Sequence, residues 1–488
     1  MRFLLSLLLL VHPAAAQIRV LAHPGKSPLV TFRIVFTTGS AAEPRAQAGL
    51  AYLTARMLAE GGTREMTYQQ IVDAMFPMAA SVSAQVDKEM CTFAGATHID
   101  NLPEYYKLLR AMLLDPGWRE DDFQRVRDDA VNAIKVGLRS NDEELGKEVL
   151  YQNIFEATPY GHYSGGTVSS LEKLTLDDVK QFYRTHYSQS HLILGIAGGY
   201  PDGFVESMKK DFRKLPPGAG FRPRMAPPPL IDATRVAIVE KDTRSVAFSI
   251  GFPIVVTRAS PDYAALLVAT SYLGQHRMSG GVLYDRMREM RGLNYGDYAY
   301  IEYFPRGMFL MEPPPNLARH FQIFQLWIRP VEPPAAKFAL RLALHELDQF
   351  IQNGIPQDGF ERTRDFLGKY VNVLTRTKGA ELGYIIDSMY YGTANYVPSL
   401  KAALARLTRD EVNRVIKRYL RVDRLVIAAV SKDGEELKRQ LASDDPSPMT
   451  YNSPKAAEIL EEDKIVEKRP LHLRPEDIKV VPAEQVFQ

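Results

Sequence analysis

Histidine spacing is the first test for zinc chemistry in this sequence. A zinc peptidase of the helical type needs two histidines four residues apart, so that both imidazoles reach one metal ion from one face of a helix. None of the ten histidines of this chain has another histidine at that spacing. The nearest two, His186 and His191, do not share a helical face, and we expect them to be polar residues at a helix end. The sequence therefore predicts no catalytic zinc.

Arg288 and Tyr295 form a second group whose types suggest chemistry. Residues 281–290 have the pattern of a helix, Gly292 suits its C-terminal stop, and Tyr295 opens the alternating segment NYGDYAYIEY, which predicts a strand. A helix end and a strand start can aim a guanidinium and a phenol at one point, where both could stabilise a substrate carbonyl or a tetrahedral intermediate. From spacing alone, a solvated arginine and a tyrosine at the edge of the core are the alternative interpretation.

Two segments of the chain share one pattern. The segment LEKLTLDDVKQFYRTHYSQSHLILGIAGG from Leu171 aligns without a gap with LARLTRDEVNRVIKRYLRVDRLVIAAVSK from Leu404. In each copy a threonine and an acid three residues later predict a capped helix, and the β-rich apolar run that follows predicts a buried strand. The chain is therefore expected to contain two related halves.

The division of the chain follows from this repeat and from one linker. Residues 214–230, KLPPGAGFRPRMAPPPL, are too rich in proline and glycine for a continuous helix or a central strand. We expect an N-terminal half at 17–213, a C-terminal half at 231–440 and an extended tail at 441–488, which is too poor in apolar residues for a core of its own.

Each half opens with strands and continues with helices. Residues 28–38 and 235–252 are rich in β-branched residues and are expected to form strands, and residues 79–97 alternate enough to form an edge strand. Cys91 in this last segment is expected to be a small buried apolar residue. The predicted fold class is α+β, with two homologous halves that each pack helices on one face of a mostly antiparallel sheet.

A family resemblance rests on the residues from Gly39. The stretch GSAAEPRAQAGLAYLTARMLAEGGT resembles the active-site helix region of the pitrilysin/insulinase family of zinc metallopeptidases. Further similar stretches include ATPYGHYSGGTVSSLEKLT and GGVLYDRMREMRGLNY, so the resemblance extends to about residue 440. It implies a peptidase-like metallohydrolase fold.

The same resemblance implies which positions would bind zinc. The family's two histidines and its catalytic glutamate fall at Tyr52, Arg56 and Ala55, and its third ligand, a glutamate, falls near Ala133. Tyrosine is a poor zinc ligand at neutral pH, alanine cannot accept a proton, and a guanidinium repels a cation. We therefore expect a degenerate zinc motif. An active peptidase that binds metal through displaced residues is a further alternative.

The resemblance also assigns a role to Arg288 and Tyr295. In the family, an arginine and a tyrosine at this spacing reach from the C-terminal half to the substrate backbone at the zinc site. This chain would then supply both residues in trans to a partner.

The start of the chain and its composition limit the setting. The opening MRFLLSLLLLVHPAAAQ resembles a secretory signal peptide cleaved after Ala16, which predicts export to the periplasm, and a mitochondrial presequence is the alternative. No apolar run is long enough to span a membrane. A net charge of +2 gives no reason to expect a nucleic-acid partner, and a single cysteine excludes an intramolecular disulfide.

Taken with these observations, the family resemblance implies a non-catalytic subunit of a heterodimeric peptidase. The expected partner is a catalytic subunit of the same family, which would hold the zinc, and the expected substrate is a peptide or an unfolded polypeptide. A non-enzymatic scaffold or binding subunit built on the same fold is the alternative from a different class.

Overall fold

The computed structural model describes residues 18–218 and 227–488. The expected signal peptide, residues 1–16, lies outside the described residues, and so does part of the expected linker, residues 219–226.

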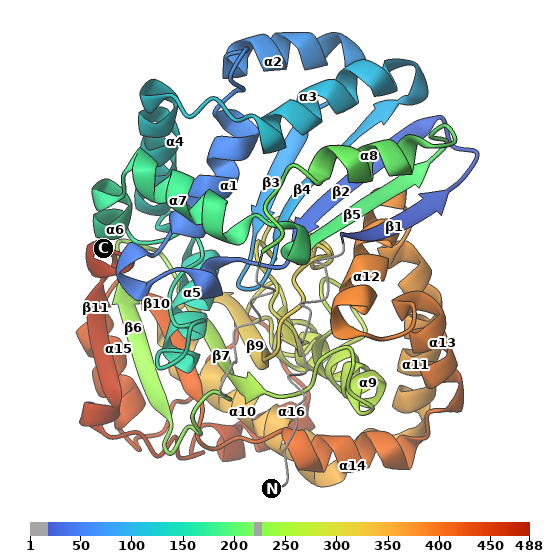
Figure 1. Ribbon diagram of the computed structural model, residues 1–488. Coiled ribbons are helices and arrows are strands. Elements are labelled where there is room, and N and C mark those ends of the chain that lie inside the picture. The colour runs from blue at the N-terminus through green and yellow to red at the C-terminus, as the bar shows by residue number, and fades with distance from the viewer. Residues whose placement is uncertain (1–17, 219–226) are drawn as a thin grey trace, which may run out of the picture.

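The N-terminal half contains a five-stranded sheet in the order β1-β5-β2-β4-β3 (Figure 1). The edge strand β1 is parallel to its neighbour β5, and the other neighbouring strands are antiparallel. Every residue of β5 is buried, as the apolar sequence LILGIAG predicts for a central strand. The strands are β1 (Arg19–Pro24), β2 (Leu29–Phe36), β3 (Val82–Val86), β4 (Cys91–His98) and β5 (Leu192–Gly198).

The C-terminal half repeats this arrangement and adds one strand. Its sheet has the order β11-β6-β10-β7-β9-β8, so β6 to β8 follow the order of the first sheet and β11 extends its edge. The strands are β6 (Arg235–Glu240), β7 (Val246–Ile254), β8 (Asp297–Tyr300), β9 (Gln322–Val331), β10 (Val426–Ser431) and β11 (Ile478–Pro482).

Sixteen α-helices surround the sheets in the described part of the chain. In the N-terminal half they are α1 (Leu50–Glu60), α2 (Tyr68–Met75), α3 (Leu102–Leu114), α4 (Glu120–Asn132), α5 (Asp142–Ile154), α6 (Val168–Lys173), α7 (Leu176–His186) and α8 (Phe204–Phe212). In the C-terminal half they are α9 (Tyr263–Gly274), α10 (Ala336–Asn353), α11 (Gln357–Leu374), α12 (Lys378–Tyr391), α13 (Tyr396–Arg406), α14 (Arg409–Tyr419), α15 (Gly434–Ala442) and α16 (Ala457–Val466).

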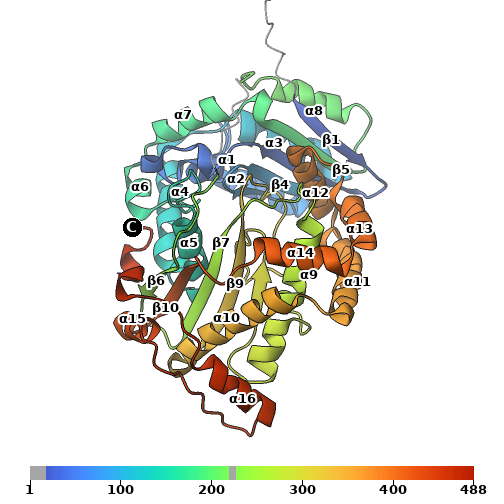
Figure 2. The same cartoon turned by 90° about the horizontal axis from the view of Figure 1, so that it is seen from below.

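The two halves exchange one helix each. Helix α5 of the N-terminal half packs on β7 and β10 of the C-terminal sheet, and helix α12 of the C-terminal half packs on β5 and β2 of the N-terminal sheet (Figure 2). Each sheet is therefore covered partly by helices of its own half and partly by a helix of the other half. The predicted α+β fold with two homologous halves is confirmed.

The repeated ends of the halves have the predicted local structure. Thr175 caps α7 and Thr408 caps α14, in both cases with a capping box completed by the acid three residues later. The buried strands β5 and β10 follow, as the apolar runs predict.

The segment 79–97 differs from the single edge strand expected from the sequence. It forms a hairpin of β3 and β4, closed by the turn Asp87–Met90, in which the Asp87 amide donates to the Met90 carbonyl at 2.8 Å. Asp87, Lys88 and Glu89 are three consecutive charged residues that interrupt the alternation, and this interruption was the available signal for the turn. Cys91 is fully buried in β4, and burial raises the pKa of its thiol to about 12, which confirms its expected apolar role.

Residues 441–488 lie across both halves. Strand β11 pairs in parallel with β6, and α16 packs on α10. Beyond β11, the Arg139 guanidinium donates to the Val486 carbonyl at 2.8 Å, and the Val168 amide at the start of α6 donates to the Phe487 carbonyl at 2.9 Å. The tail thus connects the C-terminal sheet to the N-terminal half.

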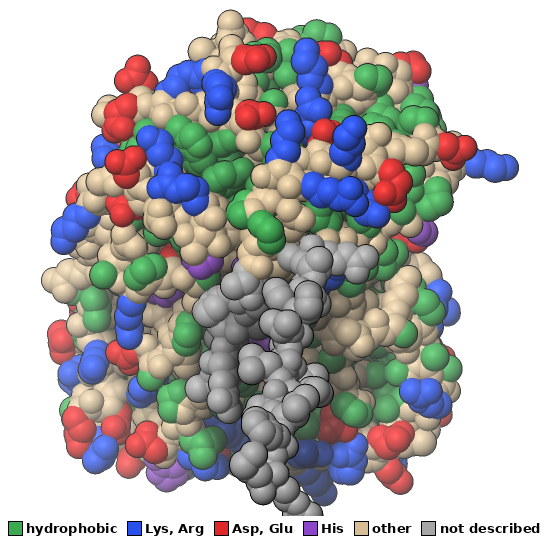
Figure 3. Space-filling view, viewed as in Figure 1, with side chains coloured by type: hydrophobic (Ala, Val, Ile, Leu, Met, Phe, Trp, Pro, Cys, Tyr) green, Lys and Arg blue, Asp and Glu red, His purple; other side chains and the backbone are tan. Residues whose placement is uncertain are grey.

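The surface carries charges of both signs. Lys and Arg side chains are interspersed with Asp and Glu over the face shown in Figure 3, in keeping with the net charge of +2. Among the described residues, none of the helices combines the length and the apolar character needed to cross a membrane.

Candidate functional site

The helix with the motif positions, α1, is capped by a residue from the preceding loop. The two carboxylate oxygens of Glu43 accept the Gly49 amide at 2.8 Å and the Ala51 amide at 2.7 Å. One of them also lies 2.9 Å from His162 Nε2. Gly49 has φ +97°, and a side chain there would collide with Leu171 and Gly166. Glu43 and Gly49 therefore fix where the helix begins.

The motif positions on α1 offer no zinc ligands of the expected kind. Ala55 is fully buried, and Tyr52 and Arg56 lie one turn apart on a partly exposed face, with the Arg56 guanidinium 3.4 Å from the Tyr52 hydroxyl. Arg56 also makes a two-pronged ion pair with Glu60, in which Nε lies 2.9 Å from Oε1. Burial alone would lower the pKa of Arg56, but the bonds to Glu60 raise it above its ordinary value. The face is therefore occupied by a fixed positive charge.

The third expected position, Ala133, is exposed and contributes only a methyl group. It begins the π-helical stretch Ala133–Leu138 that continues α4. One turn earlier, the Asp129 carboxylate lies 3.6 Å from the Arg56 guanidinium. Sequence reasoning did not identify Glu60 and Asp129 as partners of Arg56, although the four-residue spacing of Arg56 and Glu60 was a usable signal for the first of them.

The donor chemistry of this site does not fit zinc. The carboxylates of Glu60 and Asp129 are both ion-paired to Arg56, and neither motif position 52 nor 56 carries a histidine. In residues 18–218 and 227–488, no three His, Cys, Asp or Glu side chains are grouped so that they could hold a metal ion.

Arg288 and Tyr295 do come together. The Arg288 Nη1 donates to the Tyr295 carbonyl at 2.9 Å, and the guanidinium lies 4.5 Å from the centre of the Tyr295 ring. The helical turn Tyr284–Glu289 is π-helical, Gly292 ends the helix with φ +68°, and β8 starts at Asp297 rather than at Tyr295. The side chain of Tyr295 is therefore on a short connection, and 64% of its surface is exposed.

A second aromatic residue completes this surface. The Tyr284 ring lies 4.9 Å from the Arg288 guanidinium, so two rings flank one cation. Such contacts restrict the rotamers of a long arginine side chain. Tyr284 was not predicted to take part, and its position one helical turn before Arg288 was the available signal.

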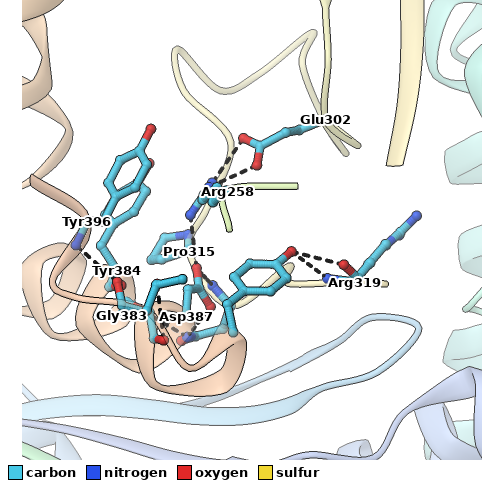
Figure 4. Close-up of polar contacts among 12 residues, drawn as sticks. Arg258, Glu302, Pro315, Arg319, Gly383, Tyr384, Asp387 and Tyr396 are labelled. Atoms are coloured by element: carbon cyan, nitrogen blue, oxygen red, sulfur yellow. Dashed lines mark hydrogen bonds and ion pairs between the residues drawn. The ribbon is translucent and has the colours of Figure 1, made fainter. Parts of the chain in front are cut away.

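A buried ionic cluster in the C-terminal half is a different kind of site (Figure 4). Arg258 donates to both carboxylate oxygens of Glu302, at 2.8 and 3.1 Å, and to Asp387 at 3.1 Å, and the rings of Tyr384 and Tyr396 lie 4.8 and 5.0 Å from its guanidinium. It borders a largely apolar cavity of about 100 Å³. Because these charges satisfy one another, the cluster serves to hold α12 in place.

Comparisons with known proteins match both halves. Residues 19–167 match the model of the insulinase family, peptidase family M16, and residues 173–367 match the model of the peptidase M16 inactive domain.

Individual proteins give the same result over most of the chain. A protein of Helicobacter pylori named non-peptidase homolog YmxG is 22% identical, over 83% of this chain and 89% of its own length. An uncharacterized zinc protease of Streptomyces coelicolor is 24% identical, over 80% of this chain and 82% of its own. The crystal structure of a peptidase M16 inactive domain from Pseudomonas fluorescens superposes with a TM-score of 0.73 at 20% identity, covering 84% of this chain and 95% of that one.

Proposed function

Because the chain belongs to the insulinase family of peptidases (peptidase M16) as an inactive member, we propose that it is the non-catalytic subunit of a periplasmic metallopeptidase heterodimer. A catalytic subunit of the same family would hold the zinc. This chain would supply Arg288 and Tyr295 to the substrate at the partner's site. The substrate is a peptide or an unfolded polypeptide.

The contribution of this chain is binding rather than bond cleavage. A guanidinium and a phenolic hydroxyl are donors that suit peptide carbonyls and the negative charge on a tetrahedral intermediate. No step of hydrolysis is assigned to α1, because Ala55 cannot act as a base and Arg56 repels a metal cation.

The observation that carries the proposal is the meeting of Arg288 and Tyr295 at the surface. A core arginine would be fully paired in the interior, as Arg258 is. Arg288 instead donates to the backbone carbonyl of Tyr295, lies 3.6 Å from the carboxylate of its neighbour Glu289, and stands beside the exposed Tyr295 ring. This arrangement restricts the guanidinium while keeping it within reach of a ligand.

Co-purification followed by activity assays tests the proposal. The tagged full-length chain, expressed in its own organism, is expected to retain an insulinase-family subunit with an intact zinc motif. The complex should cleave an unfolded probe such as reduced casein. Arg288→Ala or Tyr295→Phe in this chain should lower turnover by about a hundredfold, as loss of one transition-state donor does.

The control is Arg439→Ala in α15, which removes an exposed arginine paired only within its own helix and should leave turnover unchanged. If the complex forms and both site variants retain full turnover, the chain is a scaffold and the proposed role is wrong. N-terminal sequencing of the chain from a periplasmic extract tests the location, with Gln17 as the expected first residue.

A further inference from the structure

The tail helix α16 contacts the segment that carries Arg288 and Tyr295. Glu462 of α16 accepts from Arg291 Nη2 at 2.6 Å and forms a second, short ion pair with Arg286. The adjacent Asp463 accepts from Arg291 Nε at 2.9 Å. These two arginines stand two residues before and three residues after Arg288, so α16 holds the segment on both sides of it.

The contacts are buried and supported from several directions. The side chain of Arg291 is completely buried, and its Nη1 also donates to the Arg286 carbonyl at 3.0 Å. The second oxygen of Asp463 accepts from the Tyr451 hydroxyl at 2.6 Å. Arg286 is bound in addition by Glu346 of α10 at 2.7 Å. Hydrogen bonds between charged groups are stronger than neutral ones, so this network restricts the backbone from 286 to 291.

Charge rather than apolar burial holds most of α16 in place. Leu460 and Ile465 of this helix are 43% and 63% exposed, whereas Glu462 and Asp463 face the protein. Val466 is its one fully buried apolar side chain. A helix docked in this way depends on its ionic contacts more than on apolar burial.

We propose that Glu462 and Asp463 are positioning residues for Arg288 and Tyr295. They bind Arg291 and Arg286, and thereby fix the helical turn from which Arg288 projects and the connection that carries Tyr295. The functional meaning of this positioning rests on the proposed role of Arg288 and Tyr295. The mechanical statement, that the tail orders residues 286–295, does not depend on that role.

Hydrogen exchange on the isolated full-length chain tests the mechanical statement. The isosteric variant Glu462→Gln/Asp463→Asn keeps the volume of both side chains and removes their charges. Amide exchange in residues 286–295 should accelerate at least about tenfold, because the local opening energy falls when the ionic contacts are lost. Exchange in β5 and β10 should not change.

A matched control and a rescue separate positioning from general damage. Glu461→Gln removes the neighbouring acid, which pairs only with Lys464 within α16, and should leave exchange unchanged. Asp463→Glu keeps the charge and should restore most of the protection that Asp463→Asn loses. If the double variant loses protection in β10 as well, the single variant Glu462→Gln decides the question. Unchanged exchange in residues 286–295 of a folded variant overturns the proposal.

Activity of the complex supplies a readout that general stability would not move. Glu462→Gln/Asp463→Asn should lower turnover of casein. The same change added to Arg288→Ala/Tyr295→Phe should lower it no further, because it acts through these two residues. An additive loss would contradict positioning. Hydrogen exchange is measured on the isolated chain, so it tests this inference even if no heterodimer forms. Failure of the heterodimer hypothesis would appear only in the co-purification and activity assays.

Discussion

At the scale of single residues, Arg56 decides the character of the motif helix. Its guanidinium binds Glu60 and lies 3.6 Å from Asp129, so both carboxylates beside the motif positions pair with one cation. Two substitutions, Tyr52 and Arg56, account for the missing imidazoles. The face that would have held a metal ion is a small ion-pair network instead.

A gain-of-ligand variant tests this explanation. In Tyr52→His/Arg56→His, two imidazoles four residues apart share a helical face, and Glu60 and Asp129 lose their cation and become available as oxygen ligands. Addition of zinc should raise the Tm of this variant by about 2 °C or more, because a ligand that binds only the folded state stabilises it. The wild-type chain should show no shift. An equal shift in both proteins, or one tightly bound zinc per wild-type chain, would contradict the account.

At the scale of elements, local signals in the sequence predicted helices and strands where the pattern is unambiguous. The threonine caps of α7 and α14 and the apolar runs of β5 and β10 are formed by residues close in sequence, and therefore the repeat revealed them. The turn between β3 and β4 was missed, although the three consecutive charged residues from Asp87 to Glu89 interrupt the alternation there. The tail was expected to be extended, and neither α16 nor the partners of its acids were predicted, because Arg286 and Arg291 lie more than 170 residues away.

The candidate site, like the fold, could be predicted from the sequence only in part. The sequence identified Arg288 and Tyr295, and the structure brings them together. It could not reveal that Asp129 faces Arg56 or that the tail binds beside Arg288, because these contacts depend on how distant helices pack.

The start of β8 contains a buried acid with a measurable pH effect. Asp297 accepts from Asn294 at 2.8 Å, but its second oxygen has no partner among the described residues. Burial raises the pKa of Asp297 to about 8. The unfolded chain loses this proton near pH 4 and the folded chain keeps it up to about pH 8, so the carboxyl makes folding less favourable as pH rises between these values.

Asp297→Asn should remove this dependence. Relative to the wild-type chain, the variant should gain stability as pH rises from 5 to 7, by up to about 1.4 kcal/mol per pH unit. Urea unfolding at pH 5, 6 and 7 measures the difference. A constant difference between the two proteins across this range would show that the carboxyl is already ionised in the folded state.

At the scale of the whole molecule, the two halves are joined by charge as well as by exchanged helices. The turn between β3 and β4 of the N-terminal half inserts Asp87 and Glu89 against the loop that precedes β9. Arg319 of that loop donates from Nε to Asp87 at 2.7 Å, and both side chains are only 2% exposed. The Tyr303 ring lies 3.8 Å from the guanidinium. The junction therefore contains an ion pair that water cannot reach.

A buried ion pair of this kind should be costly to break from one side and much less costly to replace entirely. Asp87→Asn leaves the Arg319 charge without its counter-ion and should destabilise the chain by about 3 to 5 kcal/mol. Asp87→Leu/Arg319→Met removes both charges and should destabilise it less than Asp87→Asn alone, because no buried charge then remains. Asp242→Asn, which breaks the exposed pair with Lys432, should destabilise the chain far less than Asp87→Asn does. Calorimetry of the four proteins measures these differences in stability. In each protein the two halves should unfold in one transition, because α5 and α12 make each half part of the core of the other. Separate transitions in the wild-type chain, or a double variant weaker than the single one, would mean that the junction does not couple the halves in this way.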